Sequence, residues 1–315
     1  MGRKPKVKTE KFDEKKMETA YDFGSITVPT KWEEVTLQML SDYLALSKEK
    51  EDALEKDKAQ AERDKTEMPN EKDEKYNLTD KDLLRIFTNF DMEKYDVLPV
   101  ELYNSIMSNF SFVLEDMPQW KPSNHLSYNE MEFVINTMEA LKVKEYEDAE
   151  MILRNNMYDY PSLLAVLCRK VTGTKTDNVT GLSWEVNEAY DSEFANKIFD
   201  ARREMFAKMP ITKAMPLISF FFNQKNRIHK SFPKLFNDTR PELVRHSASY
   251  RRFSKEYGIT KAVYSAGDDK ITEVEKIHQI YLLDFFQYLI YESDNAYAQK
   301  ADEEYHDQQR KLHKR

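Results

Sequence analysis

An apolar run within residues 207–228, AKMPITKAMPLISFFFNQKNRI, constrains the fold of this chain more than any other feature. Its centre is PLISFFF. Three consecutive phenylalanines on a helix point in three directions, so contact with one neighbouring helix cannot bury them all. We therefore expect a short, deeply buried helix with Pro210 and Pro216 in its first turn, where a missing N–H costs nothing. The expected core anchors on it are Phe220, Phe221 and Phe222.

Composition favours a mainly helical protein. The 315 residues are enough for one large or two ordinary domains with a sizeable core. The chain has only 6 glycines, too few for a turn-rich all-β protein, and it has no glycine-rich phosphate loop. Charged residues make up 33%, so much of the chain is expected to be solvated. The net charge of −8 argues against nucleic acid binding over the whole molecule but leaves a local basic patch open.

The single cysteine, Cys168, follows the apolar LLAVL at residues 163–167, and we interpret it as a small buried hydrophobic residue. One cysteine provides no disulfide framework, which fits assembly in a reducing compartment. The N-terminal MGRKPKVKTEKF is basic but lacks the apolar segment of a signal peptide. No run reaches the about 18 apolar residues of a membrane span, so none is expected.

A capped helix and a charged insertion are expected early in the chain. Thr36 should cap the first helix, and Trp32 is the core anchor that closes over its start. The insertion at residues 47–77 alternates in charge sign and has almost no apolar face. We expect a projection, either a helix that extends as far as Met68 and is followed by a loop, or a hairpin. Plain disorder is the alternative.

A small β-hairpin is the one β element expected. The alternating MEFVI at residues 131–135 would pair with residues 141–143 around a turn at 136–138. The helical period predicts the remaining body helices, which start at 79 and 98 and extend over 146–153, 162–171 and 184–206, with a loop over 170–182.

The C-terminal region is expected to be one long helix with a basic tail. Asp269 can cap it, and an apolar stripe extends from Val274 to Leu289 before it fades. The sequence therefore predicts a mainly α fold in three parts. They are an N-terminal arm at 1–25, a multi-helix body at 26–258 with the hairpin and the charged projection, and the long helix with its tail at 259–315.

Two Glu-x-x-His pairs on this helix raise the question of a metal site. Glu275/His278 and Glu303/His306 each place both side chains on one helix face, as in di-iron bundles. Both pairs, however, lie on one expected helix, about 42 Å apart, whereas a di-iron site needs facing helices. We interpret them as solvated surface and predict no metal site. No nucleophile elbow is present, so no catalytic residue and no cofactor are predicted.

The clearest candidate interaction surface is a basic tract at residues 225–255, in which aromatic residues are interleaved with arginine, lysine and histidine. Such a mixture suits DNA phosphates and stacked bases, or an acidic protein surface. It also suits packed helices whose arginines bridge to the acidic body, and the three interpretations stay open. The predicted interaction residues are Arg227, Lys230, Arg240, Arg245, Arg251 and Arg252.

Three stretches together resemble a known group of proteins. They are VPTKWEEVTL at residues 28–37, the segment from FVI at 133–135 to LKVKEY at 141–146, and the segment from FAKMP at 206–210 to FFF at 220–222. This succession resembles helical virion and tail-assembly proteins of phages that infect Bacteroidetes, including crAss-like phages. The pattern spans residues 26–225, consists of apolar anchors and includes no catalytic motif.

The resemblance implies a non-enzymatic protein of the phage tail or head–tail region, either a ring subunit or a cargo protein carried in the tail. The implied partners are other tail or head–tail proteins and copies of itself, and the implied location is the virion, after assembly in the host cytoplasm. The charged insertion and the long last helix depart from the small tail-assembly chaperones of this group. The alternative function is nucleic-acid binding through the basic tract.

Overall fold

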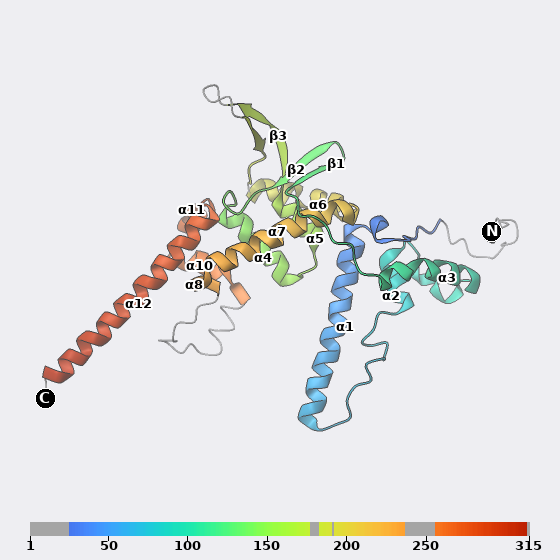
Figure 1. Cartoon of the computed structure of the whole chain (residues 1–315), viewed down its shortest axis with the longest axis horizontal. Helices are drawn as coiled ribbons and strands as arrows, with labels where there is room; N and C mark the ends of the chain where they lie inside the picture. The colour runs from blue at the N-terminus through green and yellow to red at the C-terminus, as the bar shows by residue number, and fades with distance from the viewer. Residues whose placement is uncertain (1–24, 177–182, 191, 237–255, 314–315) are drawn as a thin grey trace, which may run out of the picture.

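The computed structural model describes residues 25–176, 183–190, 192–236 and 256–313. It is mainly helical, with a small four-stranded antiparallel sheet and a long C-terminal helix, so the predicted fold class is confirmed (Figure 1). Three parts extend from the body: helix α1 (Leu37–Asp64), a ribbon of two strands, and helix α12 (Leu282–His313). The arm predicted at 1–25 lies, except for its last residue, outside the described residues.

The N-terminal lobe is built from the start of α1 and several short helices around one aromatic core. Its elements are the 3₁₀ helix η2 (Trp32–Glu34), α1, α2 (Asp80–Phe87), the 3₁₀ helix η3 (Met92–Val97), α3 (Val100–Met107) and the 3₁₀ helix η4 (Ser108–Leu114). The predicted anchor Trp32 is buried, and its ring meets that of Phe112 edge-on with 5.1 Å between centroids. The helix starts predicted at 79 and 98 are confirmed, because Thr79 caps α2 and Pro99 precedes α3.

The charged insertion forms a projection, made of the outer part of α1 and a return loop over residues 65–78. Thr36 caps α1 by accepting a hydrogen bond from the Met39 N–H, as predicted. The helix ends at Asp64, short of the predicted end at 68, because Lys65 adopts a left-handed conformation. In the return loop, Lys75 and Tyr76 both donate to Asp57 on the helix. Polar contacts therefore hold the projection, in keeping with its lack of an apolar face.

The β structure is an antiparallel sheet with the strand order β1-β2-β3-β4, and the predicted hairpin is wrong in its pairing. The strands are β1 (His125–Tyr128), β2 (Met131–Ile135), β3 (Cys168–Thr176) and β4 (Ser183–Asn187). β2 coincides with the predicted strand, but it pairs with β1 across a two-residue turn. Asn129 and Glu130 form that turn with φ angles of 49° and 60°, which match the twist of a tight hairpin. The expected partner segment instead forms a β-bridge between Lys142 and Tyr281.

Two further predictions between residues 162 and 206 need correction. The helix expected over 162–171 is α5 (Tyr160–Leu167), which ends earlier, where β3 begins. β3 then occupies the first part of the segment 170–182, which was expected to be a loop. The expected helix over 184–206 begins as β4 and is helical only in α6 (Ser192–Ala207). The β-branched and aromatic residues in CRKVTGTKT and SWEVN favour strands, and the two segments pair with each other.

The outer parts of β3 and β4 extend beyond the sheet as the β3–β4 ribbon. Only residues 168–170 of β3 pair with β2, whereas β3 and β4 remain paired as far as Thr176. The side chains of β3 from residue 172 onward are exposed. A two-stranded hairpin with exposed side chains is only marginally stable in water, so the outer ribbon adds little to the stability of the body.

The apolar run forms α7 (Ile211–Ser231), which is longer than the short helix predicted. Pro210 is its N-cap residue, but Pro216 lies inside the helix and not in the first turn. Phe221 is 1% exposed and is a core anchor, as predicted, whereas Phe220 and Phe222 are only half-buried. The body covers one side of α7, so two of the three adjacent rings lie at the margins of the buried face.

The large core lies between α4 (Val143–Asn155), α5, α6, α7 and the sheet. α4 confirms the helix predicted over 146–153, and every residue of α5 is buried. Phe133 of β2 packs edge-on against Phe206 of α6, with 5.5 Å between ring centroids. Cys168 is fully buried in this core, as predicted.

The C-terminal region is not the single long helix predicted from residue 269. After α7 come α8 (Pro233–Phe236), α10 (Ile259–Ala266), α11 (Ile271–His278) and α12. The N-cap of α11 is Lys270 and not Asp269. α11 and α12 are separate because the intervening backbone pairs with α4: the Val143 N–H donates to the Ile280 carbonyl at 3.1 Å.

Candidate functional site

The carboxylates of α4 are the centre of a polar network, and they point in several directions around the helix. α4 has the sequence VKEYEDAEMILRN, and we call its carboxylates Glu145, Glu147, Asp148 and Glu150 the α4 acidic cluster. Each of them contacts a different part of the chain. Glu145 contacts Arg169 of β3, and Glu147 contacts His278 of α11. Asp148 contacts Tyr190, which lies between β4 and α6, and Glu150 contacts Lys225 of α7. The cluster therefore holds four separate segments against α4.

The most buried member of the cluster is Glu145, which forms an ion pair with Arg169 at 2.5 Å. Both side chains are 2% exposed. Arg169 also donates to two backbone carbonyl oxygens and lies over the Tyr190 ring, 4.5 Å from its centroid. Glu145 accepts a second hydrogen bond from the Lys142 N–H at the start of α4. Loss of one partner from such a pair is strongly destabilising, because the other charge then stays buried alone.

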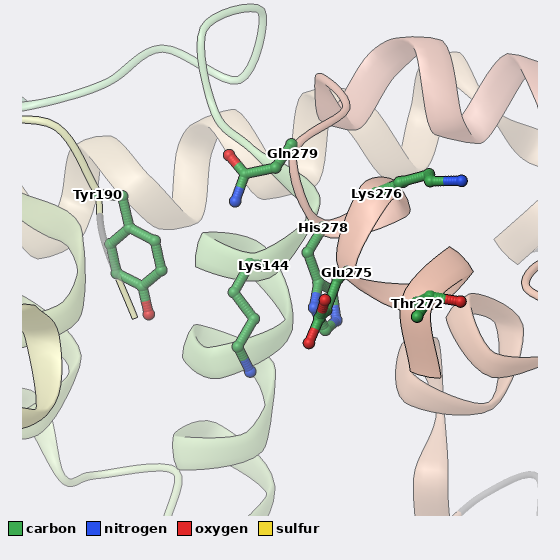
Figure 2. A pocket seen from close by; sticks show the side chains of 7 residues that line it. All are labelled: Lys144, Tyr190, Thr272, Glu275, Lys276, His278 and Gln279. Atoms are coloured by element: carbon green, nitrogen blue, oxygen red, sulfur yellow. The ribbon is translucent and has the colours of Figure 1, made fainter. Parts of the chain in front are cut away.

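An open pocket of about 590 Å³ lies beside this cluster, between α4 and α11 (Figure 2). Figure 2 shows Lys144 between Tyr190 and the α11 side chains of Glu275 and His278. All of the lining side chains have a polar or charged end. The lining residues are Lys144, Tyr190, Thr272, Glu275, Lys276, His278 and Gln279.

One wall of the pocket contains the contact between Glu147 and His278. The Nε2 atom of His278 lies 2.9 Å from a carboxylate oxygen of Glu147, whose side chain is 7% exposed. Burial alone would raise the pKa of the Glu147 carboxyl, but His278, Thr260 and Lys144 together outweigh burial and lower it. Glu147 is therefore ionised at neutral pH, and its contacts connect α4 with both α10 and α11.

The charges around the pocket are largely matched within the chain. Lys144 contacts Asp148 at 2.7 Å, and Asp148 also accepts a hydrogen bond from the Tyr190 hydroxyl. Burial and the neighbouring Asp148 raise the pKa of Tyr190 far above its usual value, so the phenol remains a donor. Because Lys144, Asp148 and Tyr190 satisfy one another, we interpret this part of the network as a means of holding α4 against the segment that precedes α6.

The two Glu-x-x-His pairs lie on different helices, α11 and α12, and not on one helix as predicted. Glu275 and His278 both line the pocket, but the nearest carboxylate to His278 is that of Glu147. Glu303 and His306 are exposed on α12. Among the residues that the structure describes, no group of three or more histidine, cysteine, aspartate or glutamate side chains is placed to hold a metal ion.

Of the predicted interaction residues, only Arg227 and Lys230 are described, and both are exposed on α7. Two lysines of the same tract are engaged with the body. Lys225 pairs with Glu150 at 2.5 Å, and Lys234 pairs with Asp294 of α12 at 2.7 Å. The remaining predicted residues lie outside the described part of the chain; they are Arg240, Arg245, Arg251 and Arg252.

The aromatic residues in the described part of the basic tract contact one another and α12. His229 stacks on Phe236 with 4.0 Å between ring centroids, and burial lowers the pKa of His229. Phe232 and Phe236 both meet the ring of Phe286 on α12. Over residues 225–236, the paired lysines and these rings favour the packed-helix interpretation of the tract.

Sequence reasoning missed the α4 acidic cluster. The segment KEYEDAE at residues 144–150 mixes charges in the way that is typical of a solvated helix face. Its local signals are the Lys144–Asp148 and Lys144–Glu147 spacings, which favour ion pairs within the helix. The other partners come from distant segments, so no spacing within α4 indicates them.

No protein-family model, curated protein or solved structure matches this chain. None of the described helices has the length and apolar character that crossing a membrane requires.

Proposed function

We propose that this chain is a non-enzymatic bacteriophage virion protein of the tail or head–tail region, which acts by oligomeric packing or as a protein cargo carried in the tail. The observation that carries the proposal is the set of three arms, the α1 projection, the β3–β4 ribbon and α12, which leave the body at separate places (Figure 1). The resemblance of residues 26–225 to virion and tail-assembly proteins of Bacteroidetes phages adds the phage context.

The arms suit contacts with neighbouring subunits better than they suit the stability of a monomer. The side chains of β3 are exposed from residue 172 onward, and hydrogen bonds from Lys75 and Tyr76 to Asp57 hold the return loop of the projection on α1. α12 exposes large side chains along its length, among them Tyr291 at 65% and Tyr305 at 56%. Ordering such segments costs conformational entropy that few contacts within the chain offset. Neighbouring subunits would provide further contacts, while the α4 acidic cluster keeps the body in one arrangement.

The proposed partners are other phage tail or head–tail proteins and further copies of this chain. The proposed location is the virion, after assembly in the host cytoplasm. No cofactor forms part of the proposal.

Quantitative mass spectrometry of purified particles tests the proposal, with particles of the phage that encodes this chain. A ring subunit should be present at a fixed copy number and should resist release. A cargo protein should be present before DNA ejection and lost afterwards. Absence of the chain from intact particles would refute both forms of the proposal.

Nucleic-acid binding through the basic tract is the second candidate, favoured by the exposure of Arg227 and Lys230 on α7. Binding to duplex DNA across a salt series measures it, because each phosphate contact contributes about −0.9 to the slope of log K against log salt. If these two residues contact phosphates, Arg227→Ala/Lys230→Ala should reduce the slope by about 1.8. An unchanged slope would exclude them from any DNA contact.

A further inference from the structure

The outer half of α12 has an exposed face with a seven-residue spacing, which we call the α12 seam. Tyr291, Ala298 and Tyr305 lie seven residues apart, and Ala301 lies between the last two. In a heptad the first three occupy a positions and Ala301 a d position, so all four share one face of the helix. All four side chains are exposed in the structure.

The seam has the form of a helix-packing surface. Two tyrosine rings, about 21 Å apart along the axis, flank two alanines. The small alanine side chains allow a second helix to approach closely at the centre, and the rings contribute large contact areas at the ends. Figure 1 shows that this part of α12 extends away from the body toward the C-terminus.

Charge distinguishes between a second copy of the chain and a different partner. Residues 292–307 contain six carboxylates and one lysine. Asp302 and Glu304 flank the seam at e and g positions, which set partner choice in paired helices. Asp294 already pairs with Lys234, which leaves five carboxylates against one lysine over this segment. If two copies of the segment lay side by side, parallel or antiparallel, each would place this net negative charge against the same charge on the other, so a second copy is disfavoured.

We propose that the α12 seam binds a basic amphipathic helix of a partner protein. The apolar face of that helix packs on the tyrosines and alanines of the seam, and its lysine or arginine side chains pair with Asp302 and Glu304. The inference rests on the proposed function, because it specifies one class of neighbour in the particle. The seam itself is a property of the isolated chain, and it is tested on the isolated chain.

The test uses synthetic helical peptides and the full chain. The probe is a peptide of three heptads with leucine at a and d and lysine at e and g, and the control peptide has glutamate at e and g. Fluorescence anisotropy at physiological salt should show that the lysine peptide binds and the glutamate peptide does not. Reversal of the flanking charges in Asp302→Lys/Glu304→Lys should exchange this preference.

A matched pair of variants separates packing from charge. Ala301→Gln places a larger side chain in the seam, and we expect it to weaken binding of the lysine peptide about tenfold, which corresponds to about 1.4 kcal/mol. Ala296→Gln makes the same change at an exposed alanine on the opposite face and should leave binding unchanged. Equal binding by the wild type and Ala301→Gln would show that charge alone holds the peptide, and would overturn the proposal.

Analytical ultracentrifugation of the chain without peptide measures its oligomeric state and tests whether a second copy occupies the seam. A wild type that dimerises, together with a monomeric Ala301→Gln, would identify a second copy as the occupant and refute the basic partner. Neither experiment involves particles, so their failure leaves the copy-number test of the proposed function unaffected. Absence of the chain from particles would likewise leave a positive peptide result standing.

Discussion

The ion pair between Glu145 and Arg169 provides the sharpest test of the α4 acidic cluster. Arg169→Met keeps much of the side-chain volume but removes the charge. The pair at 2.5 Å, the two bonds to backbone carbonyls and the contact with the Tyr190 ring are all lost. Glu145 is then a buried carboxyl without its partner. Breaking a buried pair in this way costs about 3–5 kcal/mol, a large part of the about 5–15 kcal/mol that stabilises a typical domain.

The reciprocal change should also be strongly destabilising. In Glu145→Gln the amide oxygen can still accept the hydrogen bond from the Lys142 N–H, and Arg169 keeps its two carbonyl partners, but its guanidinium charge stays buried without a counter-charge. A loss of about 3–5 kcal/mol is expected, because arginine cannot lose its charge. The double variant has no unpaired buried charge at this site. The free energy of unfolding that the double variant loses should therefore be about 0.5–3 kcal/mol smaller than the sum of the losses in the two single variants.

Urea denaturation followed by far-ultraviolet circular dichroism measures each free energy of unfolding. The matched control is the ion pair between Glu204 and Lys208 on α6, in which both side chains are 71% exposed. The same substitutions there, Glu204→Gln and Lys208→Met, should show a coupling of about 0–1 kcal/mol. A loss below about 1 kcal/mol for Arg169→Met, or a coupling no larger than that of the control, would refute the reasoning.

Three further predictions concern single residues. Phe221→Ala should cost about 3–5 kcal/mol and Phe222→Ala clearly less, because only the first ring is fully buried; equal losses in urea would contradict this. The pKa of Glu147 is lowered by folding from its usual 4.5, so this carboxylate stabilises the fold above that pH and the gain disappears as the pH falls. Glu147→Gln should therefore flatten the acid limb of the stability profile, and an unchanged limb would count against it. Burial raises the pKa of the Cys168 thiol to about 12, so a disulfide reagent should label it only at the rate of unfolding; faster labelling would reveal local opening.

Helix starts were predictable because their signals are local. Thr36 and Thr79 each precede a helical period, and each side chain accepts a hydrogen bond from an N–H in the first turn. Such a signal involves only a few neighbouring residues, so the sequence is enough to find it. The mainly α class has a similar basis, since it depends on composition and on the period of apolar residues.

Strand pairing was not predictable in the same way. Residues 131–135 and 141–143 are both apolar and lie close in sequence, which favoured a hairpin between them. β2 instead pairs with β1 and with β3, where Phe133 lies opposite Lys170. The tight turn that joins β1 to β2 contains Glu130 with a positive φ, which is uncommon for that residue type, so the local signal for it is weak.

The α4 acidic cluster shows the same limit for charged residues. Glu145 meets a partner 24 residues later in the chain, and Glu147 meets His278 on α11. The Glu-x-x-His spacing drew attention to His278 as a possible metal ligand with Glu275 on the same helix. Its close contact comes from a different helix, and that contact depends on the way in which α4 and α11 pack.

The starts of α1 and α7 join the two cores, and this arrangement fixes how the α1 arm leaves the body. The Leu37 N–H donates to the Met209 carbonyl at 2.8 Å, and the Ile211 N–H donates to the Val35 carbonyl at 3.0 Å. N–H groups in the first turn of a helix have no partner within that helix. Here the first N–H of α1 bonds to the segment before α7, and the first N–H of α7 bonds to the segment before α1. Leu37, the first residue of α1, packs in the large core, and Ile211, the first residue of α7, packs in the aromatic core of the N-terminal lobe. The start of each helix therefore contributes to the core on the other side of the junction. A change in the angle of α1 would break both hydrogen bonds and disturb both cores. An arm that contacts a neighbouring subunit, as we propose for the α1 projection, therefore has a rigid root.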